Sequence, residues 1–294
     1  MTINEYALWT AIITPLDQDG LVDFVKLELL LKKQEEASNG VVILGSTGES
    51  LNLDLSERKK IVEFSTDLNL SIPLLVGVGG VNLGTTLEWV KYLEGQKVQG
   101  YLMVTPLYAK PNDIGQKNWF QALLDKASRP CMLYNVPGRT GTPISLKALI
   151  ELQDHPNFWS VKEASGSIER FGEFVDSLPS KKVFSGDDAL LPYFALRGAT
   201  GLVSVAANVW PAQTHLYTKF CLTGRGSETL PLWEKASASL FTASNPIPAK
   251  ALLHAKEWIE TPFLRPPLTH EDFHELESIK EIDSQIDTWY KKNA

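Results

Sequence analysis

The stretch Val41-Val42-Ile43-Leu44-Gly45-Ser46-Thr47-Gly48-Glu49, at residues 41–49, contains the clearest strand of the sequence and the turn that follows it. Its first four residues are apolar on both faces of an extended chain, which is typical of a buried parallel strand. A helix over residues 24–38, ended by Asn39-Gly40, precedes this strand. Another helix follows it, with Ser56 as the expected N-cap and Leu68 at its end. The stretch therefore belongs to a strand-helix repeat.

The same unit recurs along most of the chain. Strands are expected at residues 8–14, 41–44, 73–78, 100–105, 131–136, 158–162, 182–185 and 201–206. Later helices are expected at residues 83–96, 116–127, 145–152, 168–178 and 189–196. Such alternation means a parallel sheet, and eight repeats favour a closed (β/α)8 TIM barrel. The alternative is an open doubly wound sheet, which usually carries a phosphate-binding loop near its first strand, and this sequence has none.

Beyond Asn208 the pattern is only helical. Helices are expected at residues 213–222, 230–241, 249–258 and 270–291. The sequence therefore predicts a catalytic barrel over residues 1–209 and a C-terminal helical region over residues 210–294, packed on the barrel.

Composition limits the classes of partner. The chain has 294 residues and a formal net charge of −7, which argues against a nucleic-acid or anionic membrane surface. No apolar run approaches the roughly 20 residues of a membrane span, and the N-terminus lacks the pattern of a signal peptide. Cys131 and Cys221 lie in apolar stretches without metal or redox spacing, so they read as free buried thiols. We expect a cytoplasmic protein.

Lys162 ends the strand Phe158-Trp159-Ser160-Val161-Lys162 and precedes a turn of small residues. A lysine in such apolar surroundings is partly desolvated, which disfavours the ammonium and frees the amine as a nucleophile. An amine of this kind attacks a carbonyl carbon and forms a Schiff base. The alternative, that Lys162 extends from the strand end to water, is the commoner outcome for such a segment taken alone.

Other polar residues also follow strands directly, where the loops of a barrel build its active site. The turn at residues 45–49 offers backbone N–H groups and two hydroxyls, which suit a carboxylate or an oxyanion, although a plain glycine turn fits as well. Tyr134 offers a phenol for proton transfer, or simply a core aromatic ring. Arg139 offers a bidentate clamp for a carboxylate, or a solvated surface charge. Tyr108 is a second relay hydroxyl or an interface residue.

Metal and nucleotide motifs are weak. His270 and His274 have i,i+4 spacing but no third ligand nearby, so we expect no metal there. Gly77-Val78-Gly79-Gly80 does not fit a dinucleotide fingerprint.

Seven stretches together resemble the dihydrodipicolinate synthase family, part of the superfamily of pyruvate-dependent class I aldolases and N-acetylneuraminate lyases. They are GSTGES at 45–50, TPLYAKP at 105–111, YNVPGRTG at 134–141, VKEASG at 161–166, SGDD at 185–188, GATGLVSVAAN at 198–208 and NPIPAK at 245–250. The resemblance covers essentially the whole chain in the family's order. It implies a lyase of diaminopimelate and lysine biosynthesis that condenses pyruvate with L-aspartate-4-semialdehyde and gives 4-hydroxy-tetrahydrodipicolinate.

By this resemblance, Lys162 forms the Schiff base with pyruvate. Tyr134 is the proton donor and acceptor, and Ser46 and Tyr108 are the proton relay. Tyr108 would come from a neighbouring subunit, so the resemblance implies a dimer or a dimer of dimers (a homotetramer). No metal or organic cofactor is expected.

The resemblance also assigns the substrate contacts. Thr47 and the backbone of Val203 match the pyruvate contacts. Arg139 matches the clamp for the carboxylate of the aldehyde, and Gly186 matches a residue that lines the cavity near it. Where the family usually has Thr-Thr this chain has Ser46-Thr47, a form that the related N-acetylneuraminate lyases also show. Those lyases usually lack the arginine, so Arg139 favours the synthase.

A second departure concerns regulation. In lysine-inhibited members of the family, a His, a Glu and a second Tyr line a pocket at the dimer interface. The matching positions here are Arg58, Thr86 and Leu107, with Leu51 and Leu55 beside them and Asn82 kept. The pocket thus loses the carboxylate for the ligand's ammonium. We therefore expect weak inhibition by lysine or none.

Two alternative functions stay open at this point. One is another pyruvate aldolase, for N-acetylneuraminate or a 2-keto-3-deoxy sugar acid. The other is a catalytically silent homologue that only binds a ligand, which the intact set of site residues disfavours.

Overall fold

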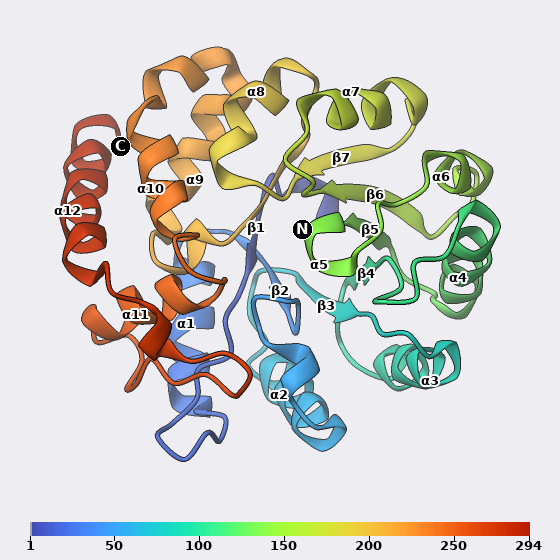
Figure 1. Cartoon of the computed structure of the whole chain (residues 1–294), viewed down its shortest axis with the longest axis horizontal. Coiled ribbons are helices and arrows are strands. Elements are labelled where there is room, and N and C mark those ends of the chain that lie inside the picture. Colours follow the sequence, from blue (N-terminus) through green and yellow to red (C-terminus); the bar gives the residue numbers. More distant parts are fainter. Residues whose placement is uncertain (1) are drawn as a thin grey trace.

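A closed barrel of eight parallel strands forms the centre of the computed structural model, which describes residues 2–294 (Figure 1). The strands follow chain order around the barrel, and the last pairs with the first. They are β1 (Leu8–Ala11), β2 (Gly40–Ile43), β3 (Leu74–Val78), β4 (Gly100–Val104), β5 (Cys131–Asn135), β6 (Phe158–Glu163), β7 (Lys182–Ser185) and β8 (Gly201–Ser204). The predicted barrel is confirmed, and the open sheet is wrong because β8 pairs with β1.

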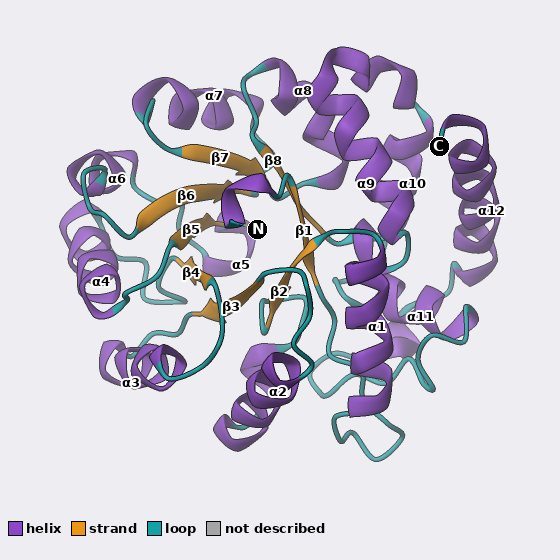
Figure 2. Ribbon diagram, turned by 180° about the vertical axis from the view of Figure 1, so that it is seen from behind, coloured by secondary structure: helices purple, strands orange, loops and turns teal. Residues whose placement is uncertain are grey.

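Burial explains the continuous apolar runs of the strands. Every residue of β1, β2, β5 and β8 is buried. One face of each strand packs inside the barrel, and the other packs beneath the surrounding helices (Figure 2). These helices are α1 (Phe24–Glu36), α2 (Leu55–Asp67), α3 (Leu83–Glu94), α4 (Asp113–Lys126), α6 (Leu146–Leu152), α7 (Ile168–Ser177) and α8 (Leu191–Leu196).

Several helix starts differ from the sequence prediction, among them those of α2 and α4. Asp54, not Ser56, is the N-cap of α2, because its side chain and that of Glu57 form a reciprocal capping box. Helix α4 begins at Asp113, three residues before the predicted start at Gln116. A further short helix, α5 (Pro137–Thr140), lies in the turn after β5.

The N-terminal segment lies across the barrel opening opposite the candidate site (Figure 2). It begins with a short 3-10 helix, Ile3–Glu5. The side chain of Asn4 accepts a hydrogen bond from Trp159 Nε1 at 2.9 Å, and its backbone oxygen accepts one from Lys182 Nζ at 3.0 Å. These contacts tie the segment to the N-terminal ends of β6 and β7. The active sites of such barrels lie at the opposite, C-terminal ends of the strands.

The C-terminal helices are α9 (Pro211–Phe220), α10 (Leu232–Ser239), α11 (Ile247–Ala255) and α12 (Leu276–Asn293). Aromatic packing joins them: the Tyr217 and Trp233 rings stack at 4.2 Å, and Trp289 of α12 meets Trp233 edge-on at 5.4 Å. The division of the chain at residue 209 stays a prediction.

Among residues 2–294, each helix is too short or too polar to cross a membrane.

The predicted helix over residues 270–291 is wrong at its start. Thr269 caps a separate 3-10 turn, His270–Asp272, and α12 begins only at Leu276. His270 and His274 therefore do not share a helical face. Within residues 2–294, no group of three or more His, Cys, Asp or Glu side chains is placed to hold a metal ion.

Candidate active site

Lys162 and Tyr134 face each other across adjacent strands. The two residues are register partners in β6 and β5, and Lys162 Nζ lies 4.2 Å from the centroid of the Tyr134 ring. Lys162 is only 5% exposed. Because side chains alternate along a strand, the next residue, Glu163, points away from Lys162. The amine and the phenol that the sequence singled out thus lie together, beside the C-terminal ends of the strands.

Gly186 packs directly against Lys162. A Cβ atom built on Gly186 would lie 2.8 Å from Lys162 Cε and 2.5 Å from Ala164 Cβ. Its N–H donates to Glu163 O at 2.6 Å, which fixes this close approach. Any larger residue here must displace the lysine side chain or the chain around it.

Three carboxyl groups lie next to Lys162 in the chain or in the loop after the neighbouring strand β7: Glu163, Asp187 and Asp188. Asp188 accepts hydrogen bonds from Ser204 Oγ and from Val205 N (3.0 Å), and Glu163 accepts one from Ser165 N at 2.7 Å. Burial raises the pKa of Asp188 and of Glu163, and it raises the pKa of Asp187 to about 6. The positive charge of Lys162 opposes the shift at both aspartates. The loop at 185–188 thus supplies the electrostatic surroundings of Lys162, a role that the sequence did not assign to the aspartates.

The loop after β2 presents its two hydroxyls differently. Ser46 is exposed on the loop. Thr47 is buried, and its Oγ1 accepts a hydrogen bond from Asn245 Nδ2 at 2.9 Å. Since Thr47 Oγ1 accepts in this contact, its own hydroxyl proton stays available for a ligand.

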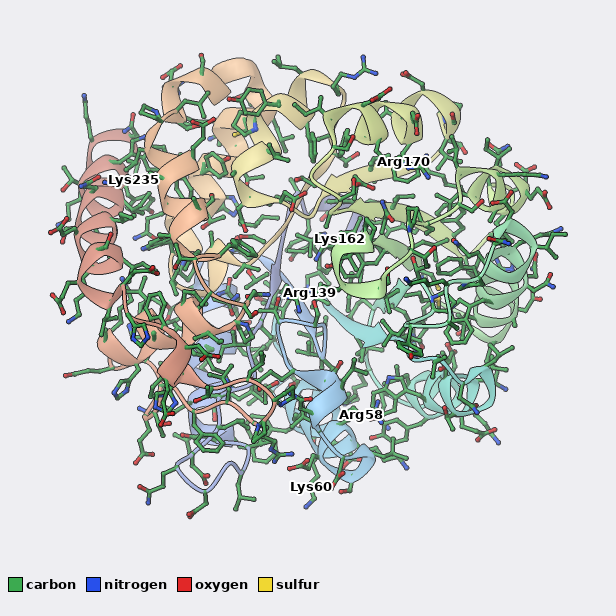
Figure 3. All side chains as sticks on the ribbon, viewed as in Figure 1. Arg58, Lys60, Arg139, Lys162, Arg170 and Lys235 are labelled. Carbon is green, nitrogen blue, oxygen red and sulfur yellow. The ribbon has the colours of Figure 1, made fainter. Side chains whose placement is uncertain are left out.

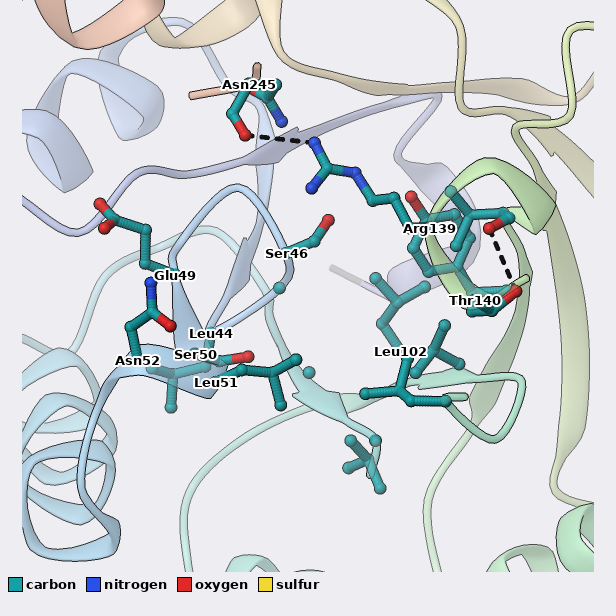
Figure 4. Close-up of a pocket in the computed structure, with 18 of the residues that line it drawn as sticks. Leu44, Ser46, Glu49, Ser50, Leu51, Asn52, Leu102, Arg139, Thr140 and Asn245 are labelled. Atoms are coloured by element: carbon teal, nitrogen blue, oxygen red, sulfur yellow. Dashed lines mark hydrogen bonds between the residues drawn. The ribbon is translucent and has the colours of Figure 1, made fainter. Parts of the chain in front are cut away.

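Arg139 lies on α5 and reaches across the mouth of the barrel toward the C-terminal region (Figure 4). Its Nη2 donates to the backbone oxygen of Asn245 at 3.1 Å. Figure 3 shows Arg139 and Lys162 close together in projection at the same opening. Asn245 therefore contacts two predicted site residues, Thr47 through its side chain and Arg139 through its backbone. Its Oδ1 is buried without a hydrogen-bond partner.

A buried ion pair joins the loop after β2 to helix α11. Lys250 Nζ lies 2.5 Å from Glu49 Oε1, and it also donates to Phe263 O at 2.9 Å. Glu49 has a left-handed backbone, with φ +53°. Sequence reasoning missed Asn245, Glu49 and Lys250 as site residues. The sequence did mark the segments that hold these three residues, because Glu49 lies in GSTGES and Asn245 and Lys250 lie in NPIPAK, two of the seven stretches that carry the resemblance.

A cavity of about 360 Å³ opens at this end of the barrel. Ser46, Tyr134, Arg139 and Asn245 line it. Lys162, Thr47, Gly186 and Val203 lie outside its lining. Val203 is fully buried in β8 and pairs with Trp9 of β1.

Tyr108 is not brought to the site within this chain. It is 92% exposed, with a left-handed φ of +64°. Such a backbone conformation is strained for a bulky residue and holds the ring away from its own core.

The two cysteines are free and buried, and burial raises the pKa of the Cys221 thiol to about 12. A thiol of this kind is a poor nucleophile at neutral pH.

Comparison with known proteins agrees with this geometry. The model of the dihydrodipicolinate synthetase family matches residues 5–286. The 4-hydroxy-tetrahydrodipicolinate synthase of Francisella tularensis subsp. novicida is 46% identical over 284 residues, with 96% of each chain covered. That of Wolbachia pipientis subsp. Culex pipiens is 46% identical over 283 residues, also with 96% of each chain covered.

Solved structures show the same fold. The 4-hydroxy-tetrahydrodipicolinate synthase of Methylacidiphilum fumariolicum superposes with a TM-score of 0.91 at 30% identity, and 98% of each chain is covered. Dihydrodipicolinate synthase from Acinetobacter baumannii, solved in complex with pyruvate, superposes with a TM-score of 0.88 at 30% identity, covering 95% of this chain and 99% of that one. The chain belongs to the dihydrodipicolinate synthetase family.

Proposed function

We propose that this protein is a 4-hydroxy-tetrahydrodipicolinate synthase, which condenses pyruvate with L-aspartate-4-semialdehyde on Lys162. The observation that carries the mechanism is the buried lysine amine, held 4.2 Å from the ring of Tyr134 at the mouth of the barrel. The relatives at 46% identity support the choice of substrates. The reaction serves the synthesis of diaminopimelate and lysine.

The reaction starts when Lys162 Nζ attacks the keto carbon of pyruvate. The carbinolamine loses water and leaves a protonated imine, which acts as an electron sink. Loss of a methyl proton then gives an enamine. Tyr134 accepts and returns the protons of these steps, because its ring lies 4.2 Å from Lys162 Nζ and carries a phenol. No metal or organic cofactor is needed for this chemistry.

The enamine carbon next attacks the aldehyde carbon of aspartate semialdehyde, whose oxygen takes up a proton. The amino group of the bound aldehyde then attacks the imine carbon, and the bond to Lys162 Nζ breaks. This step closes the ring and restores the free lysine. Overall, one pyruvate and one aldehyde give one 4-hydroxy-tetrahydrodipicolinate and one water.

The remaining residues bind and orient the substrates. Thr47 and the backbone of Val203 hold the pyruvate carboxylate. Arg139 binds the carboxylate of the aldehyde, since it lines the cavity and its Nη2 donates to a backbone carbonyl, Asn245 O. Gly186 keeps the space beside Lys162 open.

Ser46 and Tyr108 connect Tyr134 with solvent. Because Tyr108 projects from its own chain, a second copy supplies it to the site, and the active protein is a dimer or a dimer of dimers. We assign the enzyme to the cytoplasm.

A condensation assay with pyruvate and a panel of aldehydes tests this function, on wild type and Arg139→Ala. We expect a strong preference for aspartate semialdehyde, which the variant loses by a factor of about 10 in kcat/KM, as expected for a charge-assisted bidentate pair at an exposed arginine. A preference of the wild type for N-acetylmannosamine or another sugar-derived aldehyde would overturn the substrate assignment but leave the Lys162 chemistry.

A further inference from the structure

The two strands that carry Tyr134 and Lys162 also carry a second polar pair, which the proposed reaction does not use. Asn135 ends β5 and Glu163 ends β6, one residue beyond the reacting pair. Like that pair, the two residues are register partners, and both side chains are fully buried. Because side chains alternate along a strand, they point to the face opposite the amine and the phenol. Two buried polar groups thus lie directly behind the site.

A hydrogen bond joins these two side chains. Asn135 Nδ2 donates to Glu163 Oε2 at 2.5 Å. The outer atoms are bonded as well, since Glu163 Oε1 accepts from Ser165 N and Asn135 Oδ1 accepts from Ile144 N, each at 2.7 Å. A backbone N–H can only donate, so the oxygen of the amide must face Ile144 and its NH2 group must face the carboxyl. The outer contacts therefore fix the polarity of the bridge.

The bridge lies where the two strands separate. Beyond the backbone bond from Ala164 N to Asn135 O, at 2.9 Å, β5 leads into α5 and β6 leads into the loop before α7. A buried polar network in which every member is bonded rigidifies the segments that it joins. The bridge thus holds the strand ends together at the point where Lys162 lies against Tyr134.

The amide of Asn135 also closes the turn that carries Arg139. Its bond to Ile144 N spans nine positions, and α5 with Arg139 lies inside that span. The oxygen of Ile144 accepts from Arg170 Nη2 at 2.6 Å, so the end of the turn is held from two sides. The contacts of Asn135 thus reach the turn of the arginine, whereas those of Glu163 lead to β5 and to the residues after Lys162.

We propose that Asn135 and Glu163 are positioning residues for the condensation. Their hydrogen bond holds the lysine amine at the ring of Tyr134, and the amide of Asn135 also holds the turn of Arg139. Neither of the two lines the cavity, so they act through their neighbours and not on the substrates. A misplacement of about 1 Å can slow a reaction by a factor of roughly 100. The inference rests on the proposed function, because it concerns the orientation of that nucleophile.

Exchanging the two groups across the bridge tests the proposal. Glu163→Gln sets an NH2 group against the N–H donor of either Asn135 or Ser165, and Asn135→Asp sets two carboxyl groups against each other. Together the substitutions restore every contact with the bridge reversed. The new carboxylate accepts from Ile144 N and from the new amide, whose oxygen accepts from Ser165 N. Because the double variant also keeps the number of carboxyl groups, recovery reports the bridge itself.

The measurement is the rate at which pyruvate and saturating sodium borohydride modify Lys162 in folded, full-length protein. We expect each single variant to be slowed at least tenfold, and the double variant to return to within about threefold of wild type. Asn135→Ala, which also opens the turn of Arg139, should in addition raise the KM for aspartate semialdehyde to at least about three times its value in Glu163→Gln.

Asn157→Ala is the control for a purely structural loss. Asn157 lies just before the opposite end of β6, and its amide donates to Leu124 O at 3.2 Å and to Ala127 O at 2.6 Å. Its loss should lower the melting temperature but leave the rate of modification within about twofold of wild type. Thermal melting shows whether each variant is folded.

The outcomes separate this proposal from the proposed function. Because Asn135→Asp alone can fail to fold, the comparison of Glu163→Gln with the double variant decides. Modification of folded Glu163→Gln at the wild-type rate, or a double variant as slow as Glu163→Gln, would overturn the positioning role and leave the Lys162 chemistry standing. Absence of modification in wild-type protein would overturn both.

Discussion

Lys250 Nζ lies 2.5 Å from Glu49 Oε1, and both side chains are almost wholly withdrawn from solvent. The pair joins helix α11 to the loop after β2, which also carries Ser46 and Thr47. Arg265 N contacts the second oxygen of Glu49 at 3.4 Å. The loop of hydroxyls is thus anchored to the C-terminal region through one buried charge pair.

We predict that Lys250→Met destabilises the protein by about 3–5 kcal/mol, because it leaves Glu49 as an uncompensated buried charge. The double variant Glu49→Gln/Lys250→Met should be destabilised less than the single variant, since it buries no charge. Urea unfolding measures both. Lys280→Met, which breaks the exposed pair with Glu277, is the control and should stay within about 0.5 kcal/mol of wild type. Equal losses for Lys250→Met and Lys280→Met would contradict the anchoring role.

This ion pair also shows where prediction from sequence stops. Both partners lie in quoted stretches, but they are 201 positions apart, and no periodicity links them. The strands could be predicted because their apolar runs report burial locally. The contacts of Asn245 with Thr47 and Arg139 depend on how the C-terminal region folds back over the mouth of the barrel, which no local pattern encodes.

Helix boundaries were predictable only in part, for a similar reason. Ser56 is a good N-cap residue by type, but Asp54 has Glu57 at the right spacing and forms the reciprocal cap. The turn around Arg139 was predicted as a loop, and the structure has a short helix there. The partnership of Lys162 and Tyr134 was predicted from resemblance, while their 4.2 Å approach follows from strand register.

Gly186→Ala should lower kcat by at least tenfold. The added methyl group meets Ala164 Cβ at 2.5 Å, Lys162 Cε at 2.8 Å and Glu163 O at 3.1 Å, so the lysine side chain or the chain around it must move. Such a movement misplaces the Lys162 amine relative to the keto carbon of bound pyruvate. Steady-state kinetics of the condensation measures the loss.

The matched control is Gly138→Ala, because a Cβ atom there meets nothing within 4 Å. We expect its kcat to stay within about twofold of wild type, as for a substitution that adds no clash. If Gly186→Ala kept full activity, the close packing against Lys162 would have no bearing on catalysis.

Stability should depend on pH through Asp187. Burial raises the pKa of this carboxyl to about 6 from its usual value of 3.8. Between these values the folded protein binds more protons than the unfolded chain, so the contribution of Asp187 to stability falls as pH rises from about 4 to 6. Asp187→Asn removes this dependence and should stabilise the protein at pH 7 by on the order of 1 kcal/mol relative to wild type.

Urea unfolding at a series of pH values from 4 to 7, on wild type and Asp187→Asn, measures this difference. Asp19→Asn at an exposed turn is the control and should leave the pH profile of wild type unchanged. A constant difference between Asp187→Asn and wild type across the series would show that the carboxyl does not titrate in this window.

Added L-lysine should inhibit weakly or not at all up to millimolar concentrations. The structure places Arg58 and Leu107 in the cavity lining, and the Thr86 hydroxyl is already bound to Asn82 O at 2.8 Å. No carboxylate is therefore offered to the ammonium of the ligand at these positions. Initial rates at increasing lysine concentration measure the effect, and a clear inhibition curve at low millimolar lysine would refute the prediction.

The most direct test of the central claim is reductive trapping of the Schiff base. The protein is incubated with pyruvate and sodium borohydride, digested, and the modified peptide is identified by mass spectrometry. We predict one reduced pyruvyl group per chain, on Lys162, and none on the Lys162→Arg variant. Label on another lysine, or no label in folded protein, would contradict the assignment of Lys162 as the nucleophile.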